Sequence, residues 1–409
     1  MNKYLIFYSN IHINSNGKEA LLYNTLTGKN IVIKNSDISS KLYLLLNNPG
    51  ESYFIKLEGE LSVIELNEII DKKMGRIIES EISLPIQYSP NININGVLPE
   101  HYSDGIKKKL CTIDDSYEKE LFNKDYQSQM GKDIIDYFSI LNLYYDSINT
   151  LSFEYGEAYK QYLFPPLGES VLMDVDAILL FLNGKSQKLD TINLIIGDLK
   201  RADLKSLKRY ISVLKDKCIQ IHLYTLPIEK EYILSLNDLF DTIYIWDIPN
   251  TLVSGYLNNI DNIKYIGLIS NNEDYKTHYS ESEIYPYYQH SNKLFCLNES
   301  SYKIQDILDS KISKNTILSS QTMNANLFGE LSILPNGNIY SCLQFKEIGN
   351  VSMINLKEAI YKEFLIHKNW FIIRKNYKFC KKCIFNWICP PITNYELAID
   401  HVLCDQCNI

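Results

Sequence analysis

Short apolar runs alternate with amphipathic stretches between about residues 150 and 320, and this alternation restricts the possible folds more than any other feature of the chain. The run TINLIIGD at 191–198 is continuously apolar, which is typical of a strand buried on both faces of a parallel sheet. An amphipathic helical stretch follows it, and further strand-like runs come later: IQIHLYTLP, TIYIWDIP and IKYIGLIS. Repeated βα units predict an α/β fold with a parallel sheet, either open or curled into a full or partial barrel.

Two segments that flank these units complete the expected middle region. We expect a helix over YFSILNLYYDSIN (137–149), before the first unit. After the last unit, KLFCLN (293–298) has the pattern of a strand, and SSYKIQDILDS that of a helix. SEIYPYYQH, just before KLFCLN, has no clear pattern. These assignments give a βα region over residues 131–320, preceded by a connector at 96–130 that is rich in turn residues.

The first 95 residues read as a block of strands followed by short helices. Asn16-Gly17 is a tight-turn signal between two strand-like runs, and KNIVIKN is a third run. The helix ISSKLYLLLNN and the short strand YFIKL come next. We expect one further helix over LSVIELNEIIDKKMGRIIES, because its apolar residues recur at helical spacing.

This order of elements resembles the PqqD-like peptide-recognition domain, a small winged-helix module. The resemblance implies that residues 1–95 bind the leader segment of a precursor peptide by adding it as a strand to an exposed sheet edge. The alternative is a small α+β cap that only packs against the next domain.

The composition describes a globular chain of 409 residues, which is long enough for two or three domains. A net charge of −8 argues against binding to nucleic acid or to acidic membranes. The sequence has neither a signal peptide nor an apolar run that could span a membrane, so we expect a cytoplasmic protein. In that reducing compartment, nine clustered cysteines indicate metal ligands rather than disulfides.

Five of the nine cysteines lie near the end of the chain. Cys380-x2-Cys383-x5-Cys389 is followed by Cys404 and Cys407. Two thiolates separated by two residues can bind one metal centre, and later cysteines can complete a set of four. Such a set suits Zn²⁺ or an iron–sulfur cluster, and the spacing does not decide between them.

The region before these cysteines adds a second motif. LFGELSILPNGNIYSCLQF predicts a hairpin around Asn336-Gly337, and Gly337-x4-Cys342 places a cysteine on its second strand. Together, Gly337-x4-Cys342 and Cys380-x2-Cys383-x5-Cys389 resemble SPASM domains, the C-terminal domains of many radical-SAM peptide maturases. The resemblance covers residues 321–409.

The departures from the SPASM pattern concern the first of that family's two auxiliary [4Fe-4S] clusters. The window 321–327 has no upstream cysteine, and Thr393 stands where the family has a cysteine. Of the first cluster's ligands only Cys342 remains, so the resemblance implies that this cluster is lost. The second cluster keeps three ligands; the resemblance implies Cys404 as the fourth, with Cys407 or, less favoured, His401 as alternatives. The ligand set expected for one [4Fe-4S] cluster is thus Cys380, Cys383, Cys389 and Cys404.

The triplet C-x3-C-x2-C, with which radical-SAM enzymes bind the cluster that cleaves S-adenosylmethionine, is missing. Cys111, Cys218 and Cys296 are isolated. The strand end Ile196-Gly197-Asp198 resembles a degraded form of the family's cofactor-contacting Gly-Gly-Glu motif, although an ordinary strand-to-helix turn would look the same. We therefore expect no binding of S-adenosylmethionine, and Gly197 and Asp198 are at most a vestige of that site.

Nearly the whole chain resembles the pseudo-radical-SAM proteins of Bacteroidales-type peptide-modification systems, and the phrases EALLYNTLTGK and CPPITNYELAI also resemble that group. The resemblance implies a non-catalytic accessory protein with a degenerate barrel, whose partners are a precursor peptide and an active radical-SAM/SPASM maturase. Two alternatives remain from the residues themselves. One is a structural zinc protein. The other is an independent enzyme with Glu154, Glu157 or Asp198 at the mouth of a barrel.

Overall fold

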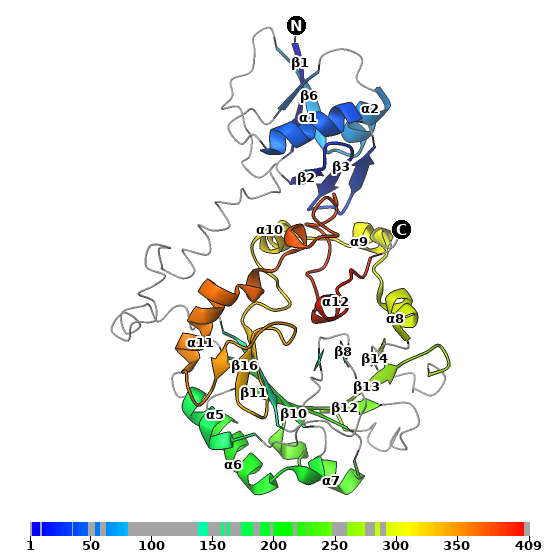
Figure 1. Cartoon of the computed structure of the whole chain (residues 1–409). Helices are drawn as coiled ribbons and strands as arrows, with labels where there is room; N and C mark the ends of the chain where they lie inside the picture. The colour runs from blue at the N-terminus through cyan, green and yellow to red at the C-terminus, as the bar shows by residue number, and fades with distance from the viewer. Residues whose placement is uncertain are drawn as a thin grey trace.

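The computed structural model describes residues 2–8, 10–34, 36–47, 54–57, 63–80, 138–145, 157–158, 162–163, 173–182, 189–196, 199–215, 219–226, 228–247, 260–274, 283–286 and 292–404. Figure 1 shows an N-terminal module in blue, a large sheet that is mostly green, and the last part of the chain, in red, between them. No helix within these ranges is both long and apolar enough to cross a membrane. The expected connector at 96–130 lies outside the described residues.

Within its described residues, the N-terminal module contains two antiparallel sheets of three strands each and two helices. One sheet has the order β5-β1-β6 and the other the order β2-β3-β4. The elements are β1 (Asn2–Phe7), β2 (Ile11–Ser15), β3 (Ala20–Asn24), β4 (Asn30–Ile33), α1 (Ser36–Asn47), β5 (Phe54–Leu57), α2 (Val63–Asp71) and β6 (Gly75–Ser80). Their apolar side chains form one core, in which Leu5, Ile13 and Leu22 are buried.

The single helix expected over residues 61–80 is wrong in its second half. Helix α2 ends at Asp71, Lys73 adopts a left-handed φ of 55°, and the chain then turns into β6. Strand β6 pairs with β1 along six residues, from Gly75 opposite Phe7 to Ser80 opposite Asn2. A Cβ atom on Gly75 would lie 2.5 Å from the carbonyl oxygen of Ile6, so the close approach of β1 requires glycine there. Pairing with β1, which is distant in the sequence, therefore makes this segment a strand and not the end of a helix.

The large sheet has nine strands within the described residues, in the order β14-β13-β12-β11-β10-β7-β15-β16-β17. Neighbours from β14 to β15 are parallel, and β15, β16 and β17 pair antiparallel. The strands are β7 (Ile140–Tyr144), β10 (Thr191–Ile196), β11 (Gln220–Thr225), β12 (Thr242–Asp247), β13 (Ile263–Ile269), β14 (Glu283–Pro286), β15 (Glu330–Ile333), β16 (Asn338–Tyr340) and β17 (Gly349–Asn350). A separate pair joins β8 (Glu157–Ala158) to β9 (Tyr162–Leu163). The predicted α/β class with a mostly parallel sheet is confirmed.

Two predicted elements of this region are wrong. The helix expected over 137–149 is strand β7, which lies between β10 and β15 and pairs with both in parallel. The strand expected over 293–298 is helix α8 (Lys293–Ser300). Short apolar runs do not distinguish strand from helix by periodicity, and for β7 the two neighbouring strands decide the outcome.

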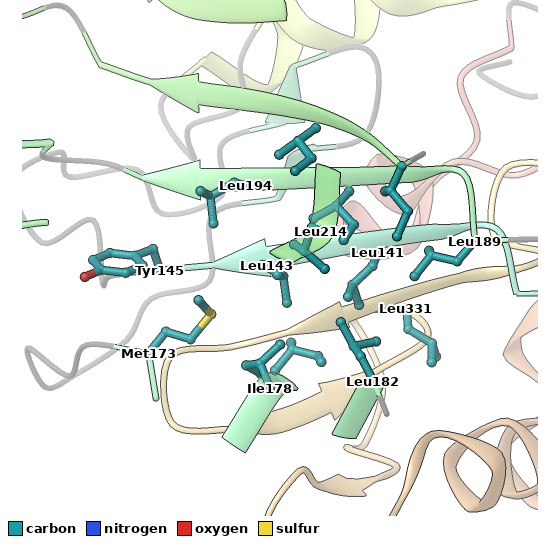
Figure 2. Packing of buried hydrophobic residues seen from close by; sticks show 14 of the residues in the cluster. Leu141, Leu143, Tyr145, Met173, Ile178, Leu182, Leu189, Leu194, Leu214 and Leu331 are labelled. Carbon is teal, nitrogen blue, oxygen red and sulfur yellow. The ribbon is translucent and has the colours of Figure 1, made fainter. Parts of the chain in front are cut away.

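Helices cover one face of the large sheet. In Figure 1, α5 (Val175–Phe181), α6 (Leu204–Lys215) and α7 (Lys230–Leu234) lie along its outer side, and α11 (Leu356–Lys362) lies beside the hairpin. Figure 2 shows Leu141, Leu143 and Leu194 of the sheet packed with Ile178 and Leu182 from the α5 region. Alternate residues of each strand contribute to this core, as the period of two requires.

The opposite face of the sheet carries aromatic and polar side chains. Tyr144, Tyr224 and Trp246 belong to a second, separate core cluster, and the rings of Tyr224 and Tyr244 stack with centroids 4.6 Å apart. Asn193 Nδ2 donates to Asn142 Oδ1 at 2.8 Å across the neighbouring strands β10 and β7. The two faces of β7 therefore differ in chemistry, apolar toward the helices and polar or aromatic on the other side.

The hairpin predicted around Asn336-Gly337 is confirmed as β15 and β16. Gly337 has a φ of +83°, and a Cβ atom there would lie 3.0 Å from the side chain of Asn350. Because β15 also pairs with β7, the large sheet takes strands from both sides of the boundary expected at residue 320. The other helical elements from residue 292 onward are α9 (Ile304–Asp309), α10 (Lys314–Thr322), the π-helical turn η9 (Glu363–His367), the 3-10 turns η10 (Asn369–Phe371) and η11 (Arg374–Asn376), and α12 (Asn394–Ile399). Two more 3-10 turns, η5 (Leu199–Arg201) and η6 (Asn237–Leu239), belong to the βα region.

Candidate metal centre

Four of the five C-terminal cysteines lie in described loops, three before α12 and one after it. Cys380 and Cys404 are buried, with exposed fractions of 5% and 7%, and Cys383 and Cys389 are partly buried. Cys383 N–H donates to the carbonyl of Cys380 at 3.0 Å, so the C-x2-C segment forms the expected tight turn. The backbone of Cys404 forms an isolated parallel β-bridge with that of Tyr302. Cys380, Cys389 and Cys404 belong to one apolar cluster.

The four thiols influence one another electrostatically. The pKa of Cys383 is raised to about 11, chiefly by burial; Cys380 and Cys404 add to the rise, and a hydrogen bond from Phe385 N–H opposes it. Burial also raises the pKa of Cys389 well above that of an ordinary thiol, while the Arg374 guanidinium opposes the rise. Thiolates are the form that binds metal, so gathering four of them here requires compensating positive charge. This donor chemistry fits a thiolate-bound metal centre.

The described side chains do not form a site for a single metal ion. Within those residues, no three His, Cys, Asp or Glu side chains are placed so that they could hold one metal ion. Cys407, the alternative fourth ligand, lies outside the described residues. His401, the other alternative, is partly buried and packs against the ring of Phe379 with centroids 5.6 Å apart.

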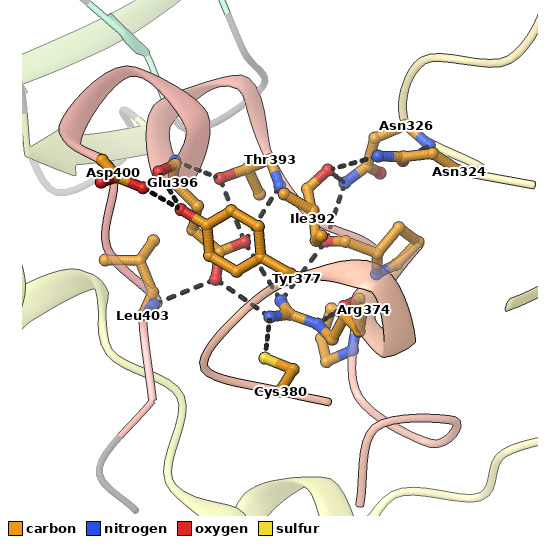
Figure 3. Close-up of polar contacts among 12 residues, drawn as sticks. Asn324, Asn326, Arg374, Tyr377, Cys380, Ile392, Thr393, Glu396, Asp400 and Leu403 are labelled. Carbon is orange, nitrogen blue, oxygen red and sulfur yellow. Dashed lines mark hydrogen bonds and ion pairs between the residues drawn. The ribbon is translucent and has the colours of Figure 1, made fainter. Parts of the chain in front are cut away.

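A buried ion pair ties the cysteine-bearing loops together (Figure 3). The guanidinium of Arg374 donates to both carboxylate oxygens of Glu396 at 3.1 Å, and both side chains are almost completely buried. Glu396 also accepts hydrogen bonds from the N–H groups of Thr393 and Leu403, each at 3.0 Å. A single carboxylate therefore joins the segment before Cys380, the segment after Cys389 and the segment before Cys404.

Arg374 also contacts the cysteine loops directly. Its Nη1 atom lies 3.7 Å from Cys380 Sγ, and its Nε atom donates to the carbonyl of Pro390, next to Cys389. Burial by itself lowers the pKa of Arg374, whereas the Glu396 carboxylate and the thiol groups of Cys389 and Cys380 raise it, so the net pKa is raised. Arg374 therefore carries a permanent positive charge beside two of the proposed ligands.

Sequence reasoning missed both residues of this pair. Thr393 and Glu396 form a capping box at the start of α12, and the pattern T-x-x-E could have revealed it. No local pattern marks Arg374, because its partner is 22 residues away in the sequence.

Cys342 lies apart from the other four cysteines. It belongs to the core beneath the large sheet, and its Sγ atom donates to Asn394 Oδ1 at 3.1 Å. Thr393, which stands at a cysteine position of the SPASM pattern, is the N-cap of α12 instead. The side chains of Cys342 and Thr393 are thus both engaged in hydrogen bonds within the protein.

The N-terminal module packs directly on the cysteine-rich loops. Leu21 and Tyr23 of β3 belong to the same apolar cluster as Cys380, Trp387 and Cys404. Asn14 Nδ2 donates to the carbonyl of Ile384 and to Asn386 Oδ1, both at 2.9 Å. The sheet β2-β3-β4 therefore lies between its own core and the candidate metal centre.

The remaining site residues expected from the sequence are not placed. Gly197, Asp198, Glu154, Cys111 and Cys218 lie outside the described residues. The same holds for the side chains of Glu157 and Cys296, whose backbones belong to β8 and α8.

Comparison with known proteins gave little that bears on this site. No protein-family model matches the chain. No curated protein matches it either. Among solved structures, the crystal structure of SuiB from Streptococcus suis is similar over 94% of each chain, with 12% identity and a TM-score of 0.36. A TM-score this low carries no conclusion about family or function.

Proposed function

We propose that this chain is a non-catalytic accessory protein in the maturation of a ribosomally synthesised peptide. In this proposal it is a cytoplasmic pseudo-radical-SAM protein with a PqqD-like module at 1–95, a degenerate βα barrel at 131–320 and a SPASM-like domain at 321–409. It binds the precursor peptide, an active radical-SAM/SPASM maturase, or both. It cleaves no S-adenosylmethionine itself, because the sequence lacks the required cysteine triplet.

One observation carries the proposal. Four cysteines with metal-ligand spacing are buried or partly buried in loops that Arg374 and Glu396 join, and these loops pack against the N-terminal module. We propose that Cys380, Cys383, Cys389 and Cys404 hold one [4Fe-4S] cluster, which supplies one-electron redox chemistry when bound. The protein's own contribution is to bury the thiolates, to place the Arg374 charge beside them and to position the module next to them.

The accessory role is tested with the full chain together with its two proposed partners. The precursor and the maturase are co-expressed with and without this chain, and the modified peptide is quantified by mass spectrometry. We expect product yield to fall strongly without the chain, and we expect the purified chain to bind the precursor or the maturase in a pull-down. Unchanged yield together with no binding to either partner rejects the proposal.

The nature of the metal needs a separate measurement. Anaerobically purified protein is expected to be brown and to contain about four iron and four sulfide per chain. Colourless protein with stoichiometric zinc instead supports the structural zinc alternative, which the thiol chemistry of the site equally allows.

A further inference from the structure

A cavity of about 600 Å³ lies between the N-terminal module and the cysteine-rich loops. One wall is formed by the end of β2, the following turn and the later part of α1, and the other by residues between Lys375 and Trp387. Hydrogen bonds across the contact fix the two walls, including one of 3.1 Å from Asn16 Nδ2 to the carbonyl of Lys382. Pockets that bind small molecules or short segments have volumes of roughly 300 to 1,000 Å³.

The lining of this cavity is strongly cationic. Lys18, Lys375, Lys381 and Lys382 line it, and among the residues that the structure describes no aspartate or glutamate does. None of the four ammonium groups forms an ion pair with a residue that the structure describes. Lys375 lies over the ring of Trp387, with Nζ 5.7 Å from the ring centroid. Because the chain as a whole carries a net charge of −8, this concentration of positive charge is a local feature that suits an anionic ligand.

The kind of anion follows from what the lining offers. Phosphate sites typically use arginine forks, backbone N–H groups or helix N-termini. Here no arginine of the described part of the chain lines the cavity, and α1 contributes Tyr43 and Leu46 from near its C-terminal end. Lysines are flexible point charges that pair with carboxylates as well as with phosphates, so the apolar part of the lining decides between them. Tyr43, Leu46 and Trp387 supply apolar surface for side chains between those carboxylates.

We propose that this cavity binds a short acidic peptide segment, whose carboxylates pair with the four lysines. The ligand class rests on the proposed function, in which a precursor peptide is a partner. Cys383 also lines the cavity, so the bound segment lies against one of the proposed cluster ligands. The proposed peptide site and the candidate metal centre are therefore adjacent in this protein.

Binding is measured on the full chain with a fluorescein-labelled octapeptide in which glutamate alternates with leucine. Fluorescence anisotropy gives Kd at low and at moderate salt, and we expect Kd to rise with salt. Lys381→Glu/Lys382→Glu is expected to raise Kd at least about tenfold, because it reverses two charges in the cavity. Lys18→Glu tests the other wall, away from the cysteines, and is expected to raise Kd several-fold. Lys205→Glu/Lys208→Glu on α6 changes the net charge equally and should leave Kd within about twofold.

Tryptophan fluorescence reports where the peptide binds. The chain has three tryptophans, and all three are buried; Trp246 and Trp370 lie elsewhere, whereas Trp387, 3% exposed, borders the cavity. Binding should change the emission of the native protein, and Trp387→Phe should abolish that change.

Three results overturn the proposal: equal Kd for the cavity and α6 variants, equal binding of a peptide with glutamine in place of glutamate, or tighter binding of tripolyphosphate that displaces the peptide. Failure here is distinct from failure of the proposed function. If product yield depends on the chain but the acidic peptide does not bind, only the cavity proposal falls. If the peptide binds as expected but yield is unchanged and neither partner binds, only the accessory role falls.

Discussion

Glu363 is fully buried at the start of the π-helical turn η9. Its carboxylate accepts hydrogen bonds from Trp370 N–H, at 2.7 Å, and from the hydroxyl of Ser341. Burial raises its pKa from 4.5 to about 7, although those hydrogen bonds oppose the rise. This single residue therefore couples the stability of the fold to pH near neutrality.

The pH dependence has a definite sign. The folded protein holds the Glu363 proton up to about pH 7, whereas the unfolded chain releases it near pH 4.5. The contribution of this group is therefore present below the unfolded pKa and is lost as pH rises through the folded pKa. Urea unfolding should show that the free energy of unfolding of the native protein falls between pH 5 and pH 8 by about 2 to 3 kcal/mol more than that of Glu363→Gln. Glu231→Gln, at an exposed position on α7, should follow the native curve, and parallel curves for all three proteins contradict the assignment.

The cysteines give a second prediction for single residues. Cys383→Ser removes one proposed ligand and is expected to lower bound metal by at least half, measured by iron and zinc analysis after anaerobic purification. Cys342→Ser is the matched control, because Cys342 lies in a different core cluster and bonds to Asn394. It should leave metal content unchanged. The ligand assignment is wrong if the metal content of Cys383→Ser equals that of the native protein.

Helix α12 shows how one short element organises three loops. Its capping box and the carboxylate of Glu396 hold the segments that carry Cys380, Cys389 and Cys404. The capping box is local and follows from the sequence pattern T-x-x-E. The pairing of Glu396 with Arg374 is not local, and it makes the element a structural centre of the tail.

Glu396→Gln should be costly because it leaves the charge of Arg374 buried without its carboxylate. We expect it to destabilise the protein by about 3 to 5 kcal/mol and to increase proteolysis of the tail. Glu358→Gln breaks a more exposed pair with Lys362, 3.3 Å long, and should cost about 0.5 kcal/mol or less. Similar unfolding curves for the two variants would falsify the structural role of Glu396.

At the scale of the whole molecule, the N-terminal module and the last third of the chain form one contact surface. Asn14 bonds to residues about 370 positions later, and Tyr23 OH accepts from Ile312 N–H at 2.8 Å. The lysine-lined cavity lies where the N-terminal module meets the loop at 375–387, so it depends on this contact.

Asn14→Ala tests this contact. It removes two hydrogen bonds between β2 and the loop at 384–386, and we expect a loss of about 1 to 2 kcal/mol with faster amide hydrogen exchange in that loop. Asn10→Ala removes a bond inside the module, from Asn10 Nδ2 to Asn24 Oδ1 at 2.7 Å, and should leave exchange in the loop unchanged. Equal exchange in the loop for both variants counts against the contact.

The sequence by itself determined the βα units, the Asn336-Gly337 hairpin and the tight turn of Cys380 and Cys383, because periodicity and turn chemistry are local properties. Only the tertiary structure decided that residues 140–144 and 75–80 are strands, because their partners lie far away in the chain. It also decided the Arg374–Glu396 pair and the packing of β2 and β3 on the cysteine loops. Side chains distant in sequence make those contacts, so the energies that select them appear only when the chain is folded.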